Sequence, residues 1–400
     1  MIDKLTLKRF TVFEDATVDF SPKINVIVGE NGTGKTHLLK AAYTLSVWNR
    51  GISASDSSTA ETFGKIFTEK LLRVFFPTER SLSELVKHKS KGKAELIVRF
   101  GEGRQDVYSF GRRTKAVSMK SSSKTPKELP APVSFPAKEV LSFLPGMKSA
   151  SADHNTIELL FDDSYLDLCE QLVHPAADIE LDDNPRVGTL IPRICNAIGG
   201  EFRISDGRLR FRPGKYVEKK TGRIEPAKEE SDNEDVDEGT PVLPQLGDDI
   251  DTIFKASGDG EKPGHTTAEG FKKVGVLQQL LANGSISPGL TGTLFWDEPE
   301  ANVNPTLMRL LVQVMLEMAR NGQQIVLATH DYVLLKWFDL LADATEGDEV
   351  RFHALYRDDE SNQVEVETCK EYRLLNENAI SDSFAELYDE EVRRAVGGGN

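Results

Sequence analysis

The sequence of 400 residues has few cysteines and no long apolar stretch. Its three cysteines, Cys169, Cys195 and Cys369, lie far apart and show neither a disulfide framework nor the spacing of a zinc site. Apolar runs such as 325–328 are much shorter than the roughly 18 residues that a membrane-spanning helix needs. The first ten residues alternate charged and apolar side chains, unlike the continuous apolar core of a signal peptide. We therefore expect a cytoplasmic protein without disulfides or membrane contact.

Positive charge is also in deficit. The chain has 64 acidic residues against 49 Lys and Arg, which gives a net charge of −15. Such a surface repels nucleic acid as a whole, so any nucleic acid would have to bind through local basic patches. One patch is the segment 111–127, which has no acidic residue and which we predict to be a basic loop, either solvated or in contact with phosphate.

A second basic patch is expected in the segment 201–212. This segment is predicted to form a β-hairpin, because Asp206-Gly207 suits a two-residue turn. The resulting register places Arg203 opposite Arg210, and like charges in that arrangement cost stability. Either Glu201 and water screen the two arginines, or an anionic ligand binds there.

The apolar fraction of 39% and the charged fraction of 28% indicate a globular chain, and its length favours two to three domains. Alternating or continuous apolar patterns predict strands over 5–7, 16–20, 24–28, 95–100 and 107–110, and helical spacing predicts a helix over 37–48. The run at 24–28 is apolar on both faces, which is typical of a central strand in an α/β sheet.

A phosphate-binding motif follows this strand. The run Gly29-Glu30-Asn31-Gly32-Thr33-Gly34-Lys35-Thr36 matches the P-loop pattern G-x-x-x-x-G-K-[ST] and lies between the predicted strand and helix. In such a loop, glycines let backbone N–H groups surround the phosphates. Lys35 would reach the β- and γ-phosphates, and Thr36 would offer its hydroxyl to Mg²⁺.

A P-loop enzyme also needs a strand that ends in carboxylates, and the run 294–298 supplies one. Asp297 would hold Mg²⁺ through its water shell, and Glu298 would be the general base that aligns the attacking water. The alternative is that the two acids only cap a helix that begins near Pro305.

A further strand is predicted over 323–330, and it ends in His330. The helix predicted over 306–320 connects it to the preceding strand, which fits a strand, helix, strand crossover. Two parallel neighbours would bring His330 beside the γ-phosphate, where we predict a catalytic role together with Glu298 and Lys35.

Four segments, 5–13, 24–36, 296–305 and 328–331, together resemble the ABC-type ATPase heads of the SMC, RecF and OLD group. The form Glu-Pro-Glu-x-x-x-x-Pro at 298–305 is most similar to OLD-like bacterial anti-phage defence ATPases. The resemblance implies an α/β fold, namely a P-loop NTPase head of ABC type with a mixed sheet, an antiparallel β-subdomain and an inserted lobe. It also implies ATP and Mg²⁺ as ligands.

We therefore expect a discontinuous head built from residues 1–50 and 255–375. Residues 51–216 would form the inserted lobe, and 376–400 a C-terminal helix. The acidic segment 217–250 is expected to be a disordered linker, because it contains too little apolar material to drive burial.

Heads of this group pair head to tail, so the resemblance implies a homodimer or a higher homo-oligomer with ATP held between two copies. The segment 266–273 would be the signature helix that contacts the ATP of the other copy, with Thr267 and Gly270 as candidate contacts. It departs from the usual Leu-Ser-Gly-Gly pattern, and the alternative is a simple helix cap.

The resemblance favours a sensor or regulatory ATPase of a bacterial anti-phage system that controls a separate effector, a nuclease or a toxin. The alternative is a RecF-like DNA-repair ATPase that clamps duplex DNA. A transporter cassette is disfavoured by the sequence around Glu300 and by the unusual signature.

Overall fold

The computed structural model describes residues 1–51, 60–121, 129–144, 161–174, 188–205, 208–218, 252–258, 260–375 and 379–395. Nearly all of the acidic segment expected to be disordered, 217–250, lies outside these residues. None of the described helices is long and apolar enough to cross a membrane.

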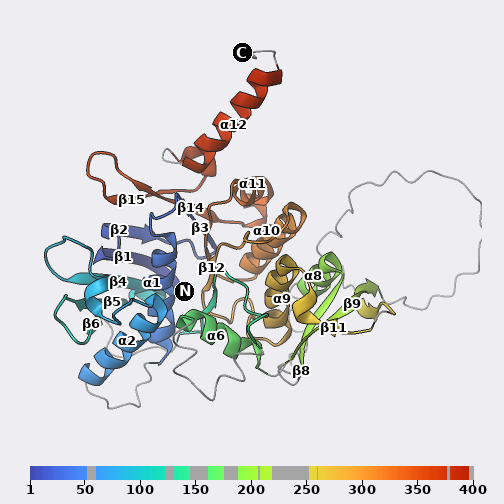
Figure 1. Ribbon diagram of the computed structural model, residues 1–400, viewed down its shortest axis with the longest axis horizontal. Helices are drawn as coiled ribbons and strands as arrows, with labels where there is room; N and C mark the ends of the chain where they lie inside the picture. The colour runs from blue at the N-terminus through green and yellow to red at the C-terminus, as the bar shows by residue number, and fades with distance from the viewer. Residues whose placement is uncertain are drawn as a thin grey trace, which may run out of the picture.

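A six-stranded mixed sheet forms the centre of the molecule (Figure 1). Its order is β15-β14-β3-β13-β12-β7, and every neighbouring pair is parallel except β14 and β15. The strand predicted over 24–28 is confirmed as a central strand, with parallel neighbours on both sides. The bounds are β3 (Ile24–Gly29), β7 (Val133–Phe135), β12 (Leu294–Asp297), β13 (Ile325–Ala328), β14 (Val350–Arg357) and β15 (Val364–Cys369).

A second sheet is wholly antiparallel and has the order β2-β1-β4-β5-β6. The predicted strands and the expected antiparallel β-subdomain are confirmed. The expected boundary between head and inserted lobe, at residue 50, does not divide this sheet, because β4 pairs directly with β1. Part of the expected basic loop, 118–121, is a strand instead. The bounds are β1 (Ile2–Phe10), β2 (Phe13–Asp19), β4 (Ala94–Phe100), β5 (Gln105–Phe110) and β6 (Ser118–Ser121).

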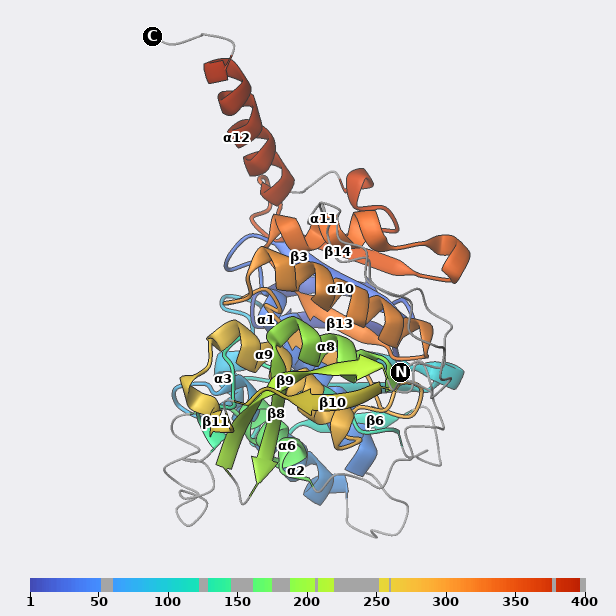
Figure 2. The same cartoon turned by 90° about the vertical axis from the view of Figure 1, so that its right-hand side faces the viewer.

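Helices cover both faces of the central sheet. Helix α1 packs between the two sheets, and α9 and α10 cover the opposite face. Helix α12 stands out from the rest of the molecule and contacts α11, with the rings of Tyr332 and Phe384 stacked 4.3 Å apart (Figure 2). The bounds are α1 (Lys35–Gly51), α2 (Ala60–Phe75), α3 (Leu82–Leu85), α6 (Asp163–Leu172), α8 (Leu190–Ile198), α9 (Glu269–Ala282), α10 (Pro305–Arg320), α11 (Tyr332–Leu341) and α12 (Ala379–Ala395).

A third group of strands contains the predicted hairpin. Its register is confirmed, since Phe202 pairs with Phe211 and Arg203 with Arg210, while the turn itself lies outside the described residues. A carboxylate oxygen of Glu201 lies 2.7 Å from the Arg203 guanidinium, as the first alternative expected for that arginine, whereas Arg210 lies 3.8 Å from a carboxylate oxygen of Glu261. The bounds are β8 (Gly200–Ser205), β9 (Arg208–Glu218), β10 (Thr252–Ala256) and β11 (Lys262–Pro263).

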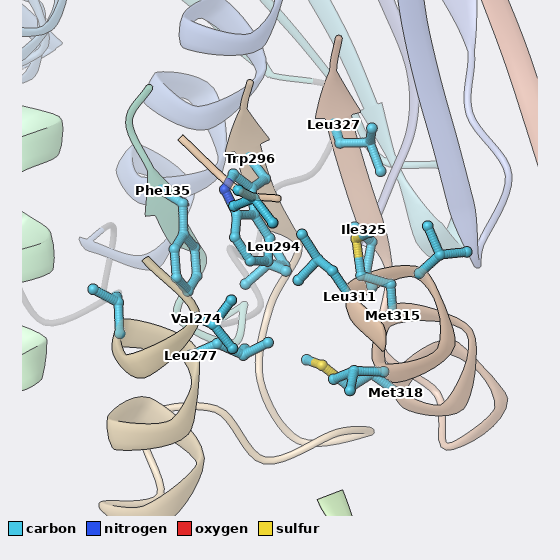
Figure 3. Packing of buried hydrophobic residues seen from close by; sticks show 14 of the residues in the cluster. Phe135, Val274, Leu277, Leu294, Trp296, Leu311, Met315, Met318, Ile325 and Leu327 are labelled. Atoms are coloured by element: carbon cyan, nitrogen blue, oxygen red, sulfur yellow. The ribbon is translucent and has the colours of Figure 1, made fainter. Parts of the chain in front are cut away.

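The strand β12 sends alternate side chains into two cores, as the period of a strand requires. Phe295 joins the core around α1, whereas Leu294 and Trp296 join the core beneath α9 and α10. In Figure 3 the Trp296 ring lies against Phe135 of β7, with Val274 and Leu277 of α9 below them; the two ring centroids are 4.4 Å apart and stacked. This packing fixes the strand that ends in the two predicted site carboxylates.

Candidate functional site

The predicted P-loop connects β3 to α1 and is held by close contacts on two sides. Gly34 has a φ of +97°, and a Cβ there would lie 2.5 Å from the Val12 side chain at the β1–β2 turn. Gly29 has a φ of +149°, and a Cβ there would overlap the carbonyl oxygen of Leu355 in β14. Both positions therefore require glycine, and the loop is held between the two sheets.

Lys35 is buried at the start of α1. Its Nζ donates to the carbonyl oxygens of Gly29 at 2.7 Å and Glu30 at 3.0 Å. Burial lowers the pKa of Lys35, while nearby carboxylates, that of Glu298 foremost, act in the opposite direction. A bound phosphate would supply the negative charge that a buried ammonium needs.

The two predicted Mg²⁺ ligands meet in space. Thr36 Oγ1 donates to Asp297 Oδ2 at 2.9 Å, although the two residues are 261 positions apart in the chain. Burial raises the pKa of Asp297, and the hydrogen bond from Thr36 opposes this shift. A hydroxyl and a carboxylate are ligands that Mg²⁺ accepts alongside water and phosphate oxygens, so the residues present fit the ion. Among the described residues there is no cluster of three or more His, Cys, Asp or Glu that could hold a metal without such a phosphate.

Glu298 and His330 also come together, at the carboxyl ends of the neighbouring strands β12 and β13. Glu298 Oε1 lies 3.4 Å from His330 Nδ1, and the Glu298 backbone is left-handed with a φ of +47°. The helix-cap alternative for the two acids is wrong, because α10 is capped by Asn304, whose side chain accepts from the Leu307 N–H at 2.9 Å.

A second glutamate, which the sequence analysis did not assign to the site, holds the chain next to His330. Glu300 Oε1 accepts from Thr329 Oγ1 at 2.7 Å and from the His330 N–H at 3.2 Å. The Glu300 carboxylate is buried, and this burial raises its pKa. In the sequence, the feature that could have pointed to Glu300 is that it is the second acid of the run Glu298-Pro299-Glu300.

Two consecutive buried lysines in α9 were also missed. Lys273 Nζ donates to the carbonyl oxygen of Glu298 and to that of Ala137, the latter at 3.0 Å. Burial lowers the pKa of Lys273 to about 8, and the carboxylates of the site, led by Glu300, limit the shift. Lys272 instead donates to Ser142 Oγ at 2.8 Å. Their position on the apolar face of a helix could have identified these lysines, because a buried lysine needs a polar partner.

The expected signature segment begins with a short turn, and α9 starts after it at Glu269. The Thr266 and Thr267 hydroxyls donate to the carbonyl oxygens of Pro263 and Gly264, at 2.7 and 2.6 Å. Neither threonine caps the helix, because the N-cap residue is Ala268. The simple-cap alternative is therefore wrong for these two threonines.

Gly270 faces the interior of its own chain. A Cβ on Gly270 would overlap the carbonyl oxygen of Asn302 and lie 3.3 Å from the Val303 Cα. The exposed part of the helix start is formed by Ala268 and Glu269 instead.

A cavity of about 570 Å³ adjoins the first turn of α1. Its lining includes Thr11, His37, Phe75, Phe76 and Arg112. The His37 and Phe75 rings are 5.7 Å apart, and burial lowers the pKa of His37 and so favours the neutral imidazole. One lining residue, His37, directly follows Thr36 of the P-loop motif, and the lining includes aromatic, aliphatic and polar side chains.

Two family profiles match the chain. Residues 4–129 match a profile described as "AAA domain", and residues 143–336 match one described as "AAA domain, putative AbiEii toxin, Type IV TA system".

Comparison with curated proteins finds short matches to the DNA replication and repair protein RecF. The RecF of Ligilactobacillus salivarius (strain UCC118) is 42% identical over 64 residues, which cover 16% of this chain and 17% of that protein. The RecF of Limosilactobacillus reuteri (strain DSM 20016) is 28% identical over 111 residues, covering 27% of this chain and 28% of the relative. The matches therefore span less than a third of either relative.

Among solved structures, the chain is similar to an SMC head bound to the C-terminal winged-helix domain of ScpA. The TM-score is 0.50 at 12% sequence identity, and the match covers 93% of this chain and 98% of that one. At this identity the likeness concerns the fold, and it confirms the predicted α/β head with its mixed sheet. The chain therefore shares the fold of an SMC head and matches AAA-domain profiles over two separate segments.

Proposed function

We propose that this chain binds ATP with Mg²⁺ and hydrolyses it, with Glu298 as the general base. The observation that carries the proposal is that five residues, which end or follow the three neighbouring strands β3, β12 and β13, lie at one edge of the sheet. Thr36 contacts Asp297 at 2.9 Å, and Glu298 lies 3.4 Å from His330, at the same edge of the sheet as Lys35.

Each residue has a role that its position permits. The N–H groups of 29–36 and the Lys35 ammonium would bind the phosphates, and Thr36 and Asp297 would hold Mg²⁺, which neutralises charge on the phosphate oxygens when bound. The Glu298 carboxylate would accept the proton of the attacking water. His330, held by Glu300, would orient Glu298 and contact the γ-phosphate.

The cavity beside His37 would take the nucleoside. The support is that its lining includes His37, the residue after Thr36, and combines aromatic surface with polar groups. A base stacks well on aromatic rings, at a value of about 1–3 kcal/mol for each stacked base.

Glu298→Gln tests the proposal, because glutamine keeps the shape of the side chain but cannot act as the base. ATP should still bind, and turnover should fall by about 10²- to 10⁴-fold. Glu386→Gln on the exposed face of α12 is the matched control and should behave as the unaltered chain. Nearly unchanged hydrolysis by Glu298→Gln would place the base elsewhere.

We further propose that ATP joins two copies, with the start of α9 of one copy facing the γ-phosphate held by the other. The support is the N-cap Ala268, which offers no side-chain acceptor to the first N–H groups of the helix. Such N–H groups, aided by the helix dipole, attract an anion.

Ala268→Asp tests this pairing. An N-cap aspartate accepts from the helix N–H groups and so stabilises the helix, but its charge repels a phosphate. The variant should melt no lower than the unaltered chain and bind ATP as a monomer, while ATP-dependent dimerisation is lost in light scattering. Dimerisation at the original ATP concentration would contradict the model. Gly270→Asp is a poorer test, because it would clash with Asn302 within the same chain.

For the biological role we propose a sensor or regulatory ATPase of a bacterial anti-phage system that controls a separate nuclease or toxin. The match of 143–336 to a profile described for a toxin of a toxin–antitoxin system supports this role. The similarity of short segments to RecF supports the alternative, a DNA-repair ATPase that clamps duplex DNA.

A titration with duplex DNA at two salt concentrations separates the two roles. In the repair role, patches that include Arg112, Arg203 and Arg210 would contact phosphates, and the slope of log affinity against log salt would fall by about 0.9 for each contact removed. In the regulatory role, DNA binding is weak at both salt concentrations. Tight, salt-dependent binding by the isolated chain would favour repair over regulation.

A further inference from the structure

We propose that Lys273 is a positioning residue that couples the start of α9, where another copy would bind, to the general base Glu298 of the same chain. The inference rests on the proposed ATPase function and adds a route by which dimerisation would control turnover.

Helix α9 touches the segment that follows β12 at two places. Lys273 Nζ donates to the Glu298 carbonyl oxygen, and the Gly270 Cα lies so close to the Asn302 carbonyl that no Cβ fits. The two contacts come from adjacent positions on one face of the helix, since they are three residues apart. They therefore tie both ends of the short segment 298–302 to the first two turns of α9.

The segment 298–302 needs such support, because its backbone is held in an uncommon conformation. Glu298 and Asn302 both have positive φ, at +47° and +63°. A glutamate adopts this left-handed conformation only where its surroundings impose it. The charged hydrogen bond from Lys273 to the Glu298 carbonyl supplies that constraint directly beside the carboxylate that would act as the base.

The helix and the strand would move together rather than slide. Figure 3 shows Val274 and Leu277 of α9 in the same core as Trp296 of β12. Lys273 is 4% exposed and also donates to Ala137 O, so its ammonium lies between the helix, β12 and the chain after β7. A buried ammonium is retained only with good partners, and here the partners are carbonyls of the site.

A movement of the α9 start on binding the phosphate of another copy would therefore reach Glu298 through Lys273. The expected consequence is that turnover per site rises when dimers form. ATP binding depends instead on Lys35 and Thr36 of α1, and Lys273 contacts neither in the described structure.

Lys273→Met tests the coupling, since methionine fills similar space without a donor. The matched control is Lys272→Met, the next residue of the same helix, which is 5% exposed but contacts Ser142 and the Glu139 carboxylate, the latter at 3.6 Å, and not the segment 298–302. For Lys273→Met we expect unchanged ATP affinity, ATP-dependent dimers, and a kcat of the dimer about 10²-fold lower with an unchanged KM, because a small misplacement of a catalytic group costs about this much. Lys272→Met should retain the rise in turnover on dimerisation.

A second readout does not depend on catalysis. Hydrogen exchange of the peptide that covers 298–304, measured without nucleotide, should become faster in Lys273→Met and stay unchanged in Lys272→Met. If Lys273→Met does not fold, Lys273→Leu replaces it, because leucine also lacks a donor and must show the same two effects.

The outcomes separate the two proposals. If the unaltered chain does not hydrolyse ATP, the proposed function fails. If the unaltered chain is active and Lys273→Met shows the same rise in turnover on dimerisation and the same exchange at 298–304, the coupling through Lys273 is wrong while the proposed function stands.

Discussion

The buried carboxylate of Glu300 permits a prediction whose sign and size follow from its contacts. Its Oε1 accepts two hydrogen bonds, from the Thr329 hydroxyl at 2.7 Å and the His330 N–H at 3.2 Å, while its Oε2 is buried without a hydrogen-bond partner. Two substitutions distinguish the effect of the hydrogen bonds from the effect of the negative charge. Glu300→Gln keeps an acceptor and removes the charge, and Glu300→Ala removes both.

Glu300→Ala should lower the free energy of unfolding by about 2–6 kcal/mol, because two donors lose their acceptor and each buried donor left unpaired costs about 1–3 kcal/mol. Glu300→Gln should be at least as stable as the unaltered chain at neutral pH, because it no longer buries an ionised group. Urea unfolding at fixed pH measures both effects. Equal stability of the alanine and glutamine variants would refute the assignment of the two hydrogen bonds.

The pH dependence gives an independent check. Burial raises the pKa of Glu300 in the folded state above its value in the unfolded chain, so the folded state takes up the proton more readily. The ionised group then opposes folding at high pH, and this cost disappears as the pH falls through the folded pKa. The stability gain of Glu300→Gln should therefore be largest at neutral pH and shrink on acidification. A gain that does not change with pH would show that the carboxylate is not the cause.

Two further predictions concern binding and stability. Lys35→Ala should abolish nucleotide binding while changing the melting temperature little, because the hydrogen bonds of Lys35 go to carbonyls of its own loop; calorimetric titration with ATP and a thermal melt test this, and unchanged affinity would remove the loop from the proposed site. Arg320→Leu should destabilise the fold by about 3–5 kcal/mol, because a buried charge is left without its partner. The Asp348 side chain is 1% exposed and receives two hydrogen bonds from Arg320, at 2.8 and 2.7 Å. Urea unfolding of this variant within about 1 kcal/mol of the unaltered chain would contradict that argument.

Local chemistry sufficed to predict several features. The P-loop spans consecutive residues between a strand and a helix, so its pattern and its context lie in one short segment. The hairpin at 201–212 was predicted down to its register, because a two-residue turn and an alternation of apolar and charged side chains leave one pairing. The apolar run at 24–28 likewise required a strand buried on both faces.

The sequence alone could not reveal the contacts between distant segments that no motif implies. The contacts of Lys273 with the Glu298 carbonyl and of Glu300 with the His330 N–H are formed only in the folded chain, where buried polar groups must find hydrogen-bond partners. Gly270 was predicted to face another copy, whereas the tertiary structure packs it against Asn302. The periodicity of a segment determines which side chains share a face, and the tertiary structure decides what that face meets.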